Sequence, residues 1–164
     1  MKLIVSDASP LIVIARSGLL PVLCTIVEEV IIPQTVHNEC TVNSALPGAQ
    51  AIRLAVAAQQ IQVRPDATGP DDDLGDVIPG LDAGELSAIR LALALQCPIL
   101  MDERIGRQVA RRKGLSVIGS AGLLLAAKQR GLICAIAPIF DQWRQSGYFV
   151  SADIIRSVLE RAGE

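Results

Sequence analysis

Short apolar runs rich in β-branched residues recur along the chain, and stretches with helical periodicity lie between them. The runs are Lys2–Val5, Val30–Ile32, Pro98–Met101, Leu115–Ile118 and Ile133–Ile136. Most of them do not alternate with polar residues, as is typical of strands that are covered on both faces. Strands separated by helices pair in parallel through right-handed crossovers. The pattern therefore predicts an α/β fold with three layers, α/β/α, around a central, mainly parallel sheet of about five strands.

Apolar residues at helical spacing predict the helices that separate these runs. The ranges are Leu46–Gln60, Ala83–Gln96, Arg104–Lys113, Ala121–Arg130 and Ala152–Ala162, with shorter helices at Leu11–Arg16 and Gln34–Val42. Ser120 and Ser151 are predicted to be N-caps, and Gly163 is predicted to end the last helix.

The length of 164 residues, 51% of them hydrophobic, suits one well-buried core. We therefore predict a single domain over residues 1–164, with a loop at 65–80 and a C-terminal helical segment at 140–164. The loop is rich in proline, glycine and aspartate. Its Asp71–Asp73 run lacks the ligand spacing of a calcium-binding loop and is interpreted as solvated.

The composition also limits where the chain works and what it contacts. Its mean hydropathy is +0.43, yet charges or turn residues break every apolar run well short of the ~20 residues of a membrane span. The N-terminal apolar run is too short for a signal peptide, so we expect a cytoplasmic protein that does not contact the membrane.

The four cysteines are far apart and are interpreted as reduced packing residues. A net charge of -2 gives no general attraction to nucleic acid, so such binding needs a local basic stripe.

Acidic residues follow two of the predicted strands at the sheet edge where parallel sheets bind ligands. Asp7 comes after the first strand, and Asp102 follows the strand at Pro98–Met101. Glu39 lies about two turns into the helix after the second strand, and Glu85 lies in the first turn of the helix before Asp102. If the first strand neighbours the one before Asp102, all four carboxylates can converge.

Converging carboxylates repel one another and raise their pKa values unless a cation is bound. Hard oxygen ligands without nearby histidine or cysteine favour Mg²⁺ or Mn²⁺ over zinc. Such a cation can activate water and stabilise charge on a phosphate.

Each acid also has a purely structural interpretation. Asp7 and Asp102 could cap the helices that follow them, and Glu85 could close a capping box with Asp82. Glu39, alone on a short helix, could simply face solvent.

Four short motifs occur in an order that resembles one family. They are Val5-Ser6-Asp7-Ala8-Ser9-Pro10-Leu11, Gly84-Glu85-Leu86-Ser87-Ala88-Ile89, Leu100-Met101-Asp102-Glu103-Arg104 and Val117-Ile118-Gly119-Ser120. Over about residues 2–160 the chain resembles the PIN-domain superfamily, and within it a VapC-like branch of poorly characterised prokaryotic proteins. Two features depart from the common pattern: Ala8 separates Asp7 from Ser9, and the mid-chain acid is Glu85 rather than Asp.

The resemblance implies a Mg²⁺- or Mn²⁺-dependent ribonuclease that is the toxin of a type II toxin–antitoxin system. It implies that Asp7, Glu39, Glu85 and Asp102 are catalytic and that Asp7, Glu85 and Asp102 are metal ligands. Ser9 and Ser120 are implied to be supporting hydroxyls. The implied partners are an RNA substrate, a small antitoxin protein and a second copy of the chain in a homodimer. The alternative is a PIN-like binding module that has little catalysis and acts through protein or RNA contacts.

A basic stripe follows the last acid. Arg104, Arg107 and Arg111 are spaced three and four residues apart, so they share one helix face. They could bind the phosphates of a nucleic acid. They could equally form a solvated basic face near a helix C-terminus.

Overall fold

Five short strands form one parallel sheet at the centre of the computed structural model, which describes residues 1–68 and 78–164. The strands are β1 (Leu3–Ser6), β2 (Glu29–Pro33), β3 (Ile61–Arg64), β4 (Ile99–Leu100) and β5 (Val117–Ile118). Their order across the sheet is β3-β2-β1-β4-β5, so β1 lies in the middle. Leu3 pairs with Glu29 on one side of β1, and Val5 pairs with Ile99 on the other.

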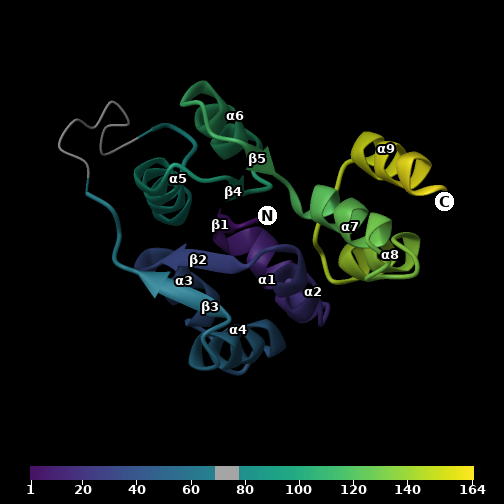
Figure 1. Cartoon of the computed structure of the whole chain (residues 1–164), viewed down its shortest axis with the longest axis horizontal. Helices are drawn as coiled ribbons and strands as arrows, with labels where there is room; N and C mark the ends of the chain where they lie inside the picture. Colours follow the sequence, from purple (N-terminus) through teal and green to yellow (C-terminus); the bar gives the residue numbers. More distant parts are fainter. Residues whose placement is uncertain (69–77) are drawn as a thin grey trace.

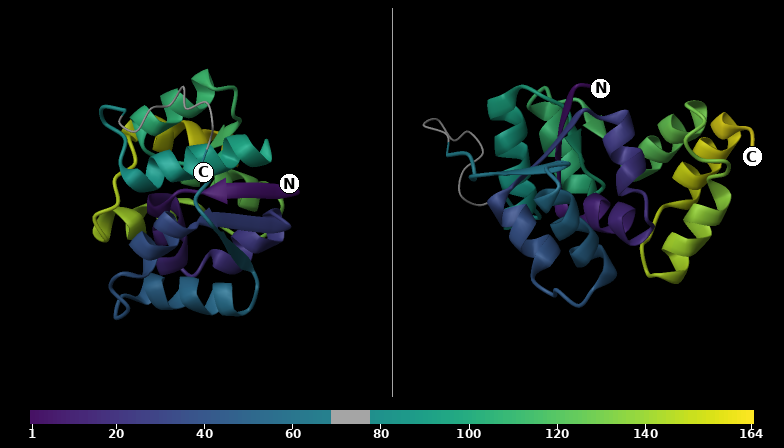
Figure 2. Two further views of the ribbon diagram at one scale, coloured as in Figure 1. Left: turned by 90° about the vertical axis from the view of Figure 1, so that its left-hand side faces the viewer. Right: turned by 60° about the horizontal axis from the view of Figure 1, so that its bottom comes forward.

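Helices flank both faces of this sheet (Figures 1 and 2). In the described residues they are α1 (Ala8–Arg16), α2 (Leu20–Ile26), α3 (Gln34–Thr41), α4 (Pro47–Ala57), α5 (Ala83–Leu95), α6 (Arg104–Arg112), α7 (Ser120–Gln129), α8 (Ala137–Gln145) and α9 (Ala152–Ala162). α5 packs against β1 and β2, whereas α9 packs against α7. The predicted three-layer α/β/α fold is confirmed.

The core consists mainly of aliphatic side chains from the inner strands and from the helix faces that cover them. Ile4, Ile32, Ile99 and Leu100 are fully buried, and Leu11 of α1 is buried with them. Strands covered on both faces carry apolar residues at successive positions because neither side of the pleat meets water. Burial of these strands holds the residues that follow them at one edge of the sheet.

Two elements of the sequence prediction are wrong. Ile133–Ile136 is not a strand: this segment is irregular, and Ile136 fills the core while its N–H donates to Glu164 Oε1 at 2.7 Å. The missing strand is β3, whose sequence Ile-Gln-Val-Arg alternates apolar and polar residues because it lies at the edge of the sheet. The sequence analysis also missed α2, and it included α8 only as part of the C-terminal helical segment at 140–164.

The predicted helix ends are largely confirmed. Ser151 caps α9 by accepting from the N–H of Ile154 at 3.3 Å, and Gly163 ends that helix with φ 73°. Ser120 is the first residue of α7 rather than its cap, because the N-cap position is occupied by Gly119.

Other expectations are met only in part or lie beyond what the structure describes. The described parts of the 65–80 loop contain no helix or strand, and Asp71–Asp73 lies outside the described residues. Cys40 and Cys97 are buried, whereas Cys134 is exposed and so does not pack in the core.

In residues 1–68 and 78–164, no single helix is long and apolar enough to cross a membrane. One pair, α1 and α2, bent by 119°, passes that test by length and composition only.

Candidate active site

Asp7 and Asp102 leave two neighbouring strands at the same edge of the sheet. β1 and β4 are paired in parallel, and the N–H of Asp7 donates to the carbonyl of Leu100 at 2.9 Å. Asp7 directly follows β1, and Asp102 stands two residues beyond β4. This is the edge at which open parallel sheets bind ligands.

Asp7 is buried and carries a strongly raised pKa. It occupies the N-cap position of α1, but its side chain makes no capping hydrogen bond, so the capping interpretation is wrong. Its pKa is raised from 3.8 to about 7, mainly by burial and also by the nearby carboxylates of Glu85, Asp82 and Glu39. The N–H of Ala8 opposes this rise.

Glu39, Asp82 and Glu85 form an acidic cluster with Asp7. Burial raises the pKa values of Glu39 and Glu85, and the carboxylate of Asp82 adds to both shifts. A Cβ atom on Gly84 would lie only 2.5 Å from each carboxylate oxygen of Glu39, so the acid from α3 packs directly on the backbone of α5. The structure therefore brings together three of the four predicted acids and adds Asp82.

Glu85 also makes the predicted capping box. Its N–H donates to Asp82 Oδ1 at 2.8 Å, while its own Oε2 accepts from the N–H of Asp82 at 3.0 Å. This reciprocal pair begins α5 and fixes both carboxylates at the sheet edge. Glu85 therefore both caps α5 and belongs to the acidic cluster.

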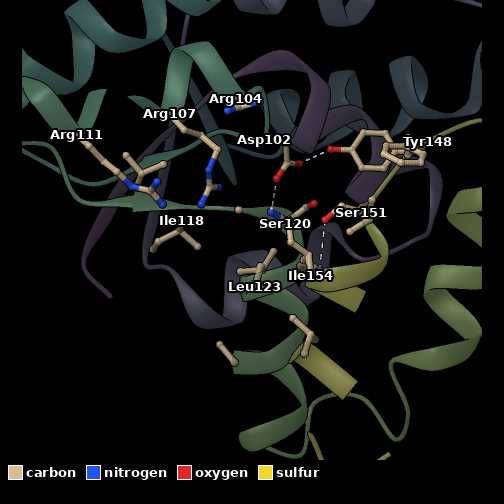
Figure 3. A pocket seen from close by; sticks show the side chains of 18 of the residues that line it. Asp102, Arg104, Arg107, Arg111, Ile118, Ser120, Leu123, Tyr148, Ser151 and Ile154 are labelled. Carbon is tan, nitrogen blue, oxygen red and sulfur yellow. Dashed lines mark hydrogen bonds between the residues drawn. The ribbon is translucent and has the colours of Figure 1, made fainter. Parts of the chain in front are cut away.

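Asp102 is held by a different set of partners. Its Oδ1 accepts from the N–H of Ser120 at 2.8 Å, and its Oδ2 accepts from the hydroxyl of Tyr148 (Figure 3). Asp102 does not cap α6, because Glu103 does so by accepting from the N–H of Gly106 at 2.8 Å. Tyr148 connects Asp102 to the acidic cluster: burial raises its pKa above its ordinary value, Asp102 contributes next, and Asp7 also contributes.

The basic stripe lines a groove beside Asp102. Arg104, Arg107 and Arg111 border a cavity of about 1040 Å³ whose other walls come from β5, α7 and the segment before α9 (Figure 3). Arg104 and Arg111 are exposed. Arg107 is half-buried, and its Nη1 donates to the carbonyl of Met101 at 2.8 Å. Burial lowers the pKa of Arg107, and the charge of Arg111 lowers it further.

The donor set at this edge fits a hard divalent cation in its chemistry. The acids of the cluster offer carboxylate oxygens, and three of the carboxyl groups have pKa values raised by burial and by neighbouring carboxylates. The thiol of Cys40 also lies near Asp7 and Glu39, but burial and these charges raise its pKa to about 12, so it keeps its proton. A cation would relieve the repulsion between the carboxylates. Within the described residues, however, no three histidine, cysteine or acidic side chains are already grouped as metal ligands.

Comparison with known proteins identifies the family. The family model described as PIN domain (DUF3368) matches residues 3–164. The chain belongs to the PIN-domain family.

Solved structures resemble the PIN fold described here. One is a PilT N-terminus domain protein from the hyperthermophilic archaeon Sulfolobus solfataricus P2, with a TM-score of 0.55 and 16% identity over 77% of this chain and 93% of that chain. Another is a domain of a functionally unknown protein from Methanocaldococcus jannaschii, with a TM-score of 0.48 and 16% identity over 73% of this chain and 91% of that one. No curated protein matches.

The two predicted supporting hydroxyls lie in different surroundings in this PIN domain. Ser120 is buried and uses its N–H to bind Asp102, and its side chain bonds to Tyr148. Ser9 is exposed in the first turn of α1, and no hydrogen bond described in the structure joins its hydroxyl to a carboxylate.

Two residues at the site were missed by the sequence analysis. Asp82 was considered only as a cap, although its position three residues before Glu85 placed it in the cluster. Tyr148 lies 46 residues after Asp102 and was not among the residues expected at the site. Its one distinguishing sequence signal is that it is the only tyrosine of the chain.

Proposed function

We propose that this PIN domain is a divalent-metal-dependent ribonuclease. The observation that carries the proposal is the cluster of Asp7, Glu39, Asp82 and Glu85 at the sheet edge next to Asp102, where burial and neighbouring carboxylates raise the pKa values of Asp7, Glu39 and Glu85. Such repulsion is unfavourable unless a cation binds. PIN domains are commonly nucleases, which agrees with this interpretation.

Asp7, Glu85 and Asp102 are the residues proposed to hold Mg²⁺ or Mn²⁺. When bound, the ion supplies an activated water and stabilises charge on the phosphate. Glu39 adds negative charge next to Gly84 and keeps the cation near Asp7. In the metal-free protein the pKa of Asp7 is about 7, so binding of a cation near neutral pH would release a proton from this carboxyl group.

Arg104, Arg107 and Arg111 are proposed to bind the RNA backbone. They line the groove that begins at Asp102, so a strand lying along them would bring a phosphate to the acidic edge. Phosphate contacts of this kind carry no base sequence information, so cleavage specificity must come from other contacts.

A narrower proposal is that the chain is the toxin of a type II toxin–antitoxin system, inhibited by a small antitoxin protein and acting as a homodimer. It rests on the resemblance of the four motifs to VapC-like proteins. Expression should arrest growth, and Asp7→Asn together with Asp102→Asn should abolish the arrest.

The alternative is an RNA- or protein-binding PIN module with little catalysis. It is favoured by the finding that the described acids are not grouped as ready metal ligands and by the two hydrogen bonds already made to Asp102.

Titration calorimetry and RNA cleavage assays distinguish the two functions. We expect the wild-type protein to bind Mn²⁺ and to cut single-stranded RNA only when Mg²⁺ or Mn²⁺ is present. Asp7→Asn should weaken Mn²⁺ binding and abolish cleavage. Equal Mn²⁺ binding by wild type and Asp7→Asn, or RNA cleavage that survives both Asp7→Asn and Asp102→Asn, would contradict the ribonuclease proposal. RNA binding without metal-dependent cleavage would support the binding module.

A further inference from the structure

The hydroxyl of Tyr148 makes a direct contact with a proposed metal ligand. It donates to Oδ2 of Asp102, while Oδ1 of the same carboxylate accepts from the N–H of Ser120 at 2.8 Å (Figure 3). A carboxylate offers about four lone-pair sites in all, so two hydrogen bonds leave both oxygens able to contact a cation. Each carboxylate oxygen of Asp102 accepts one of these two hydrogen bonds, so together they fix the orientation of the carboxylate.

Tyr148 is itself held firmly. Its ring packs edge-on against Trp143, with 5.5 Å between centroids and an interplanar angle of 75°, and its N–H donates to the carbonyl of Trp143 at 2.9 Å. Trp143 is 1% exposed, and its Nε1 donates to Ser17 Oγ at 2.7 Å. Ser17 follows the C-terminus of α1, the helix that begins next to Asp7. The phenol is therefore anchored to the same helix that carries Asp7 at its other end.

The chemistry of the phenol suits a donor at this place. A tyrosine hydroxyl has an ordinary pKa of about 10, so it keeps its proton and can donate at neutral pH. Hydrogen-bond partners of metal-ligating carboxylates orient the ligand and tune its affinity for the ion.

We propose that Tyr148 is a positioning residue for Asp102. It holds the carboxylate in the orientation that receives a divalent cation, and it acts only through Asp102. This role rests on the proposed metal-dependent function.

The first test is titration calorimetry with Mn²⁺ on Tyr148→Phe. The phenylalanine ring retains the contact with Trp143 and removes only the hydroxyl. We expect Mn²⁺ affinity to fall roughly 10–100-fold, the usual effect of removing such a hydrogen-bond partner. In an Asp102→Asn background, Tyr148→Phe should cause no further loss, because the residue acts through Asp102.

Ser17→Ala is the matched control. It removes the acceptor of the Trp143 indole and so perturbs the anchor of Tyr148 without removing either partner of the Asp102 contact. We expect it to lower the thermal midpoint of unfolding and to leave Mn²⁺ affinity within about twofold of wild type, the scatter expected for a change that removes no partner of Asp102.

A second readout, NMR of the tyrosine ring, does not depend on RNA cleavage. Since Tyr148 is the only tyrosine, ring-¹³C-tyrosine labelling gives NMR signals from this residue alone. Adding Mg²⁺ should shift these signals in wild type and leave them unchanged in Asp102→Asn.

The outcomes separate this role from the function on which it rests. If wild type binds Mn²⁺ and Tyr148→Phe binds it equally or more tightly, the positioning role is wrong and the metal site stands. If wild type does not bind Mn²⁺, both the proposed metal site and the role of Tyr148 are overturned.

Discussion

The carboxylate of Glu39 lies against the backbone of Gly84, where a Cβ atom would approach both of its oxygens to 2.5 Å. Glycine at this position lets α3 and α5 bring their acids together. Because the atoms in the way are the far end of a flexible side chain, an added methyl group would displace the carboxylate without unfolding the helix.

We therefore expect Gly84→Ala to keep the fold and to weaken Mn²⁺ binding by about 10-fold, as the loss of a supporting contact does. Calorimetry measures the affinity, and urea denaturation measures the stability. Gly122→Ala is the control, because its nearest neighbour would be Ile118 Cγ2 at 3.9 Å. That variant should gain up to about 1 kcal/mol of stability from helix propensity with unchanged Mn²⁺ affinity. Unchanged affinity in Gly84→Ala would show that Glu39 does not act on the cation.

The pKa of Asp7 predicts how the stability of the metal-free protein depends on pH. A folded-state pKa of about 7 against 3.8 means that the folded protein holds a proton which the unfolded chain has released between these values. Stability must therefore fall as pH rises from about 4 to about 7 and then level off, by roughly 4 kcal/mol for such a shift.

Urea denaturation in EDTA at pH 5 and pH 8 checks this dependence. Asp7→Asn should lose most of the difference between the two pH values and should be more stable than wild type at pH 8. Saturating Mn²⁺ should reduce the difference in wild type. A wild-type protein that is equally stable at both pH values, or a variant with the same pH dependence, would contradict the assigned environment of Asp7.

Glu85 has two roles that one substitution separates. A glutamine at this position can still complete the capping box, because its side-chain oxygen can accept from the N–H of Asp82. We expect Glu85→Gln to retain the unfolding free energy within about 0.5 kcal/mol or to raise it, while Mn²⁺ affinity falls at least 10-fold. Asp82→Ala, which removes the cap, should instead lose about 1 kcal/mol of stability. If Glu85→Gln binds Mn²⁺ as wild type does, the residue is only a cap.

The exposed arginines of the stripe are expected to contact phosphates. Arg104→Gln and Arg111→Gln should each weaken binding to single-stranded RNA at every sequence tested and lower the salt dependence of log K by about 0.7 per lost contact. Fluorescence anisotropy at several salt concentrations measures both quantities. Arg144→Gln is the control, since this arginine is exposed on α8 and pairs with Asp141. Equal losses in all three variants would mean a general charge effect instead of a groove.

The sheet could be predicted where strands are buried on both faces. β1, β2 and β4 come from continuous apolar runs, as does the half-buried edge strand β5; parallel crossovers predicted their direction but not their order. β3 could not be found in this way, because an edge strand packs on fewer neighbours and tolerates Gln62 and Arg64. A strand was wrongly predicted at Ile133–Ile136, because a loop that packs into the core has the same apolar composition as a short strand.

The site could be predicted where it depends on strand ends. Asp7 and Asp102 follow paired strands, so the sheet itself brings them to one edge. Tyr148 could not be predicted, since its contact with Asp102 depends on how the segment between α8 and α9 folds back over 46 residues of sequence. No local pattern encodes such a return.

The strand order β3-β2-β1-β4-β5 has a consequence for protein synthesis. Asp7 is synthesised before its neighbouring strand β4, and Tyr148 is made 46 residues after Asp102. A nascent chain therefore carries Asp7 beside an edge of β1 that stays unpaired until β4 has emerged. If the site cuts RNA, this order of synthesis keeps it incomplete until the segment that carries Tyr148 has emerged from the ribosome.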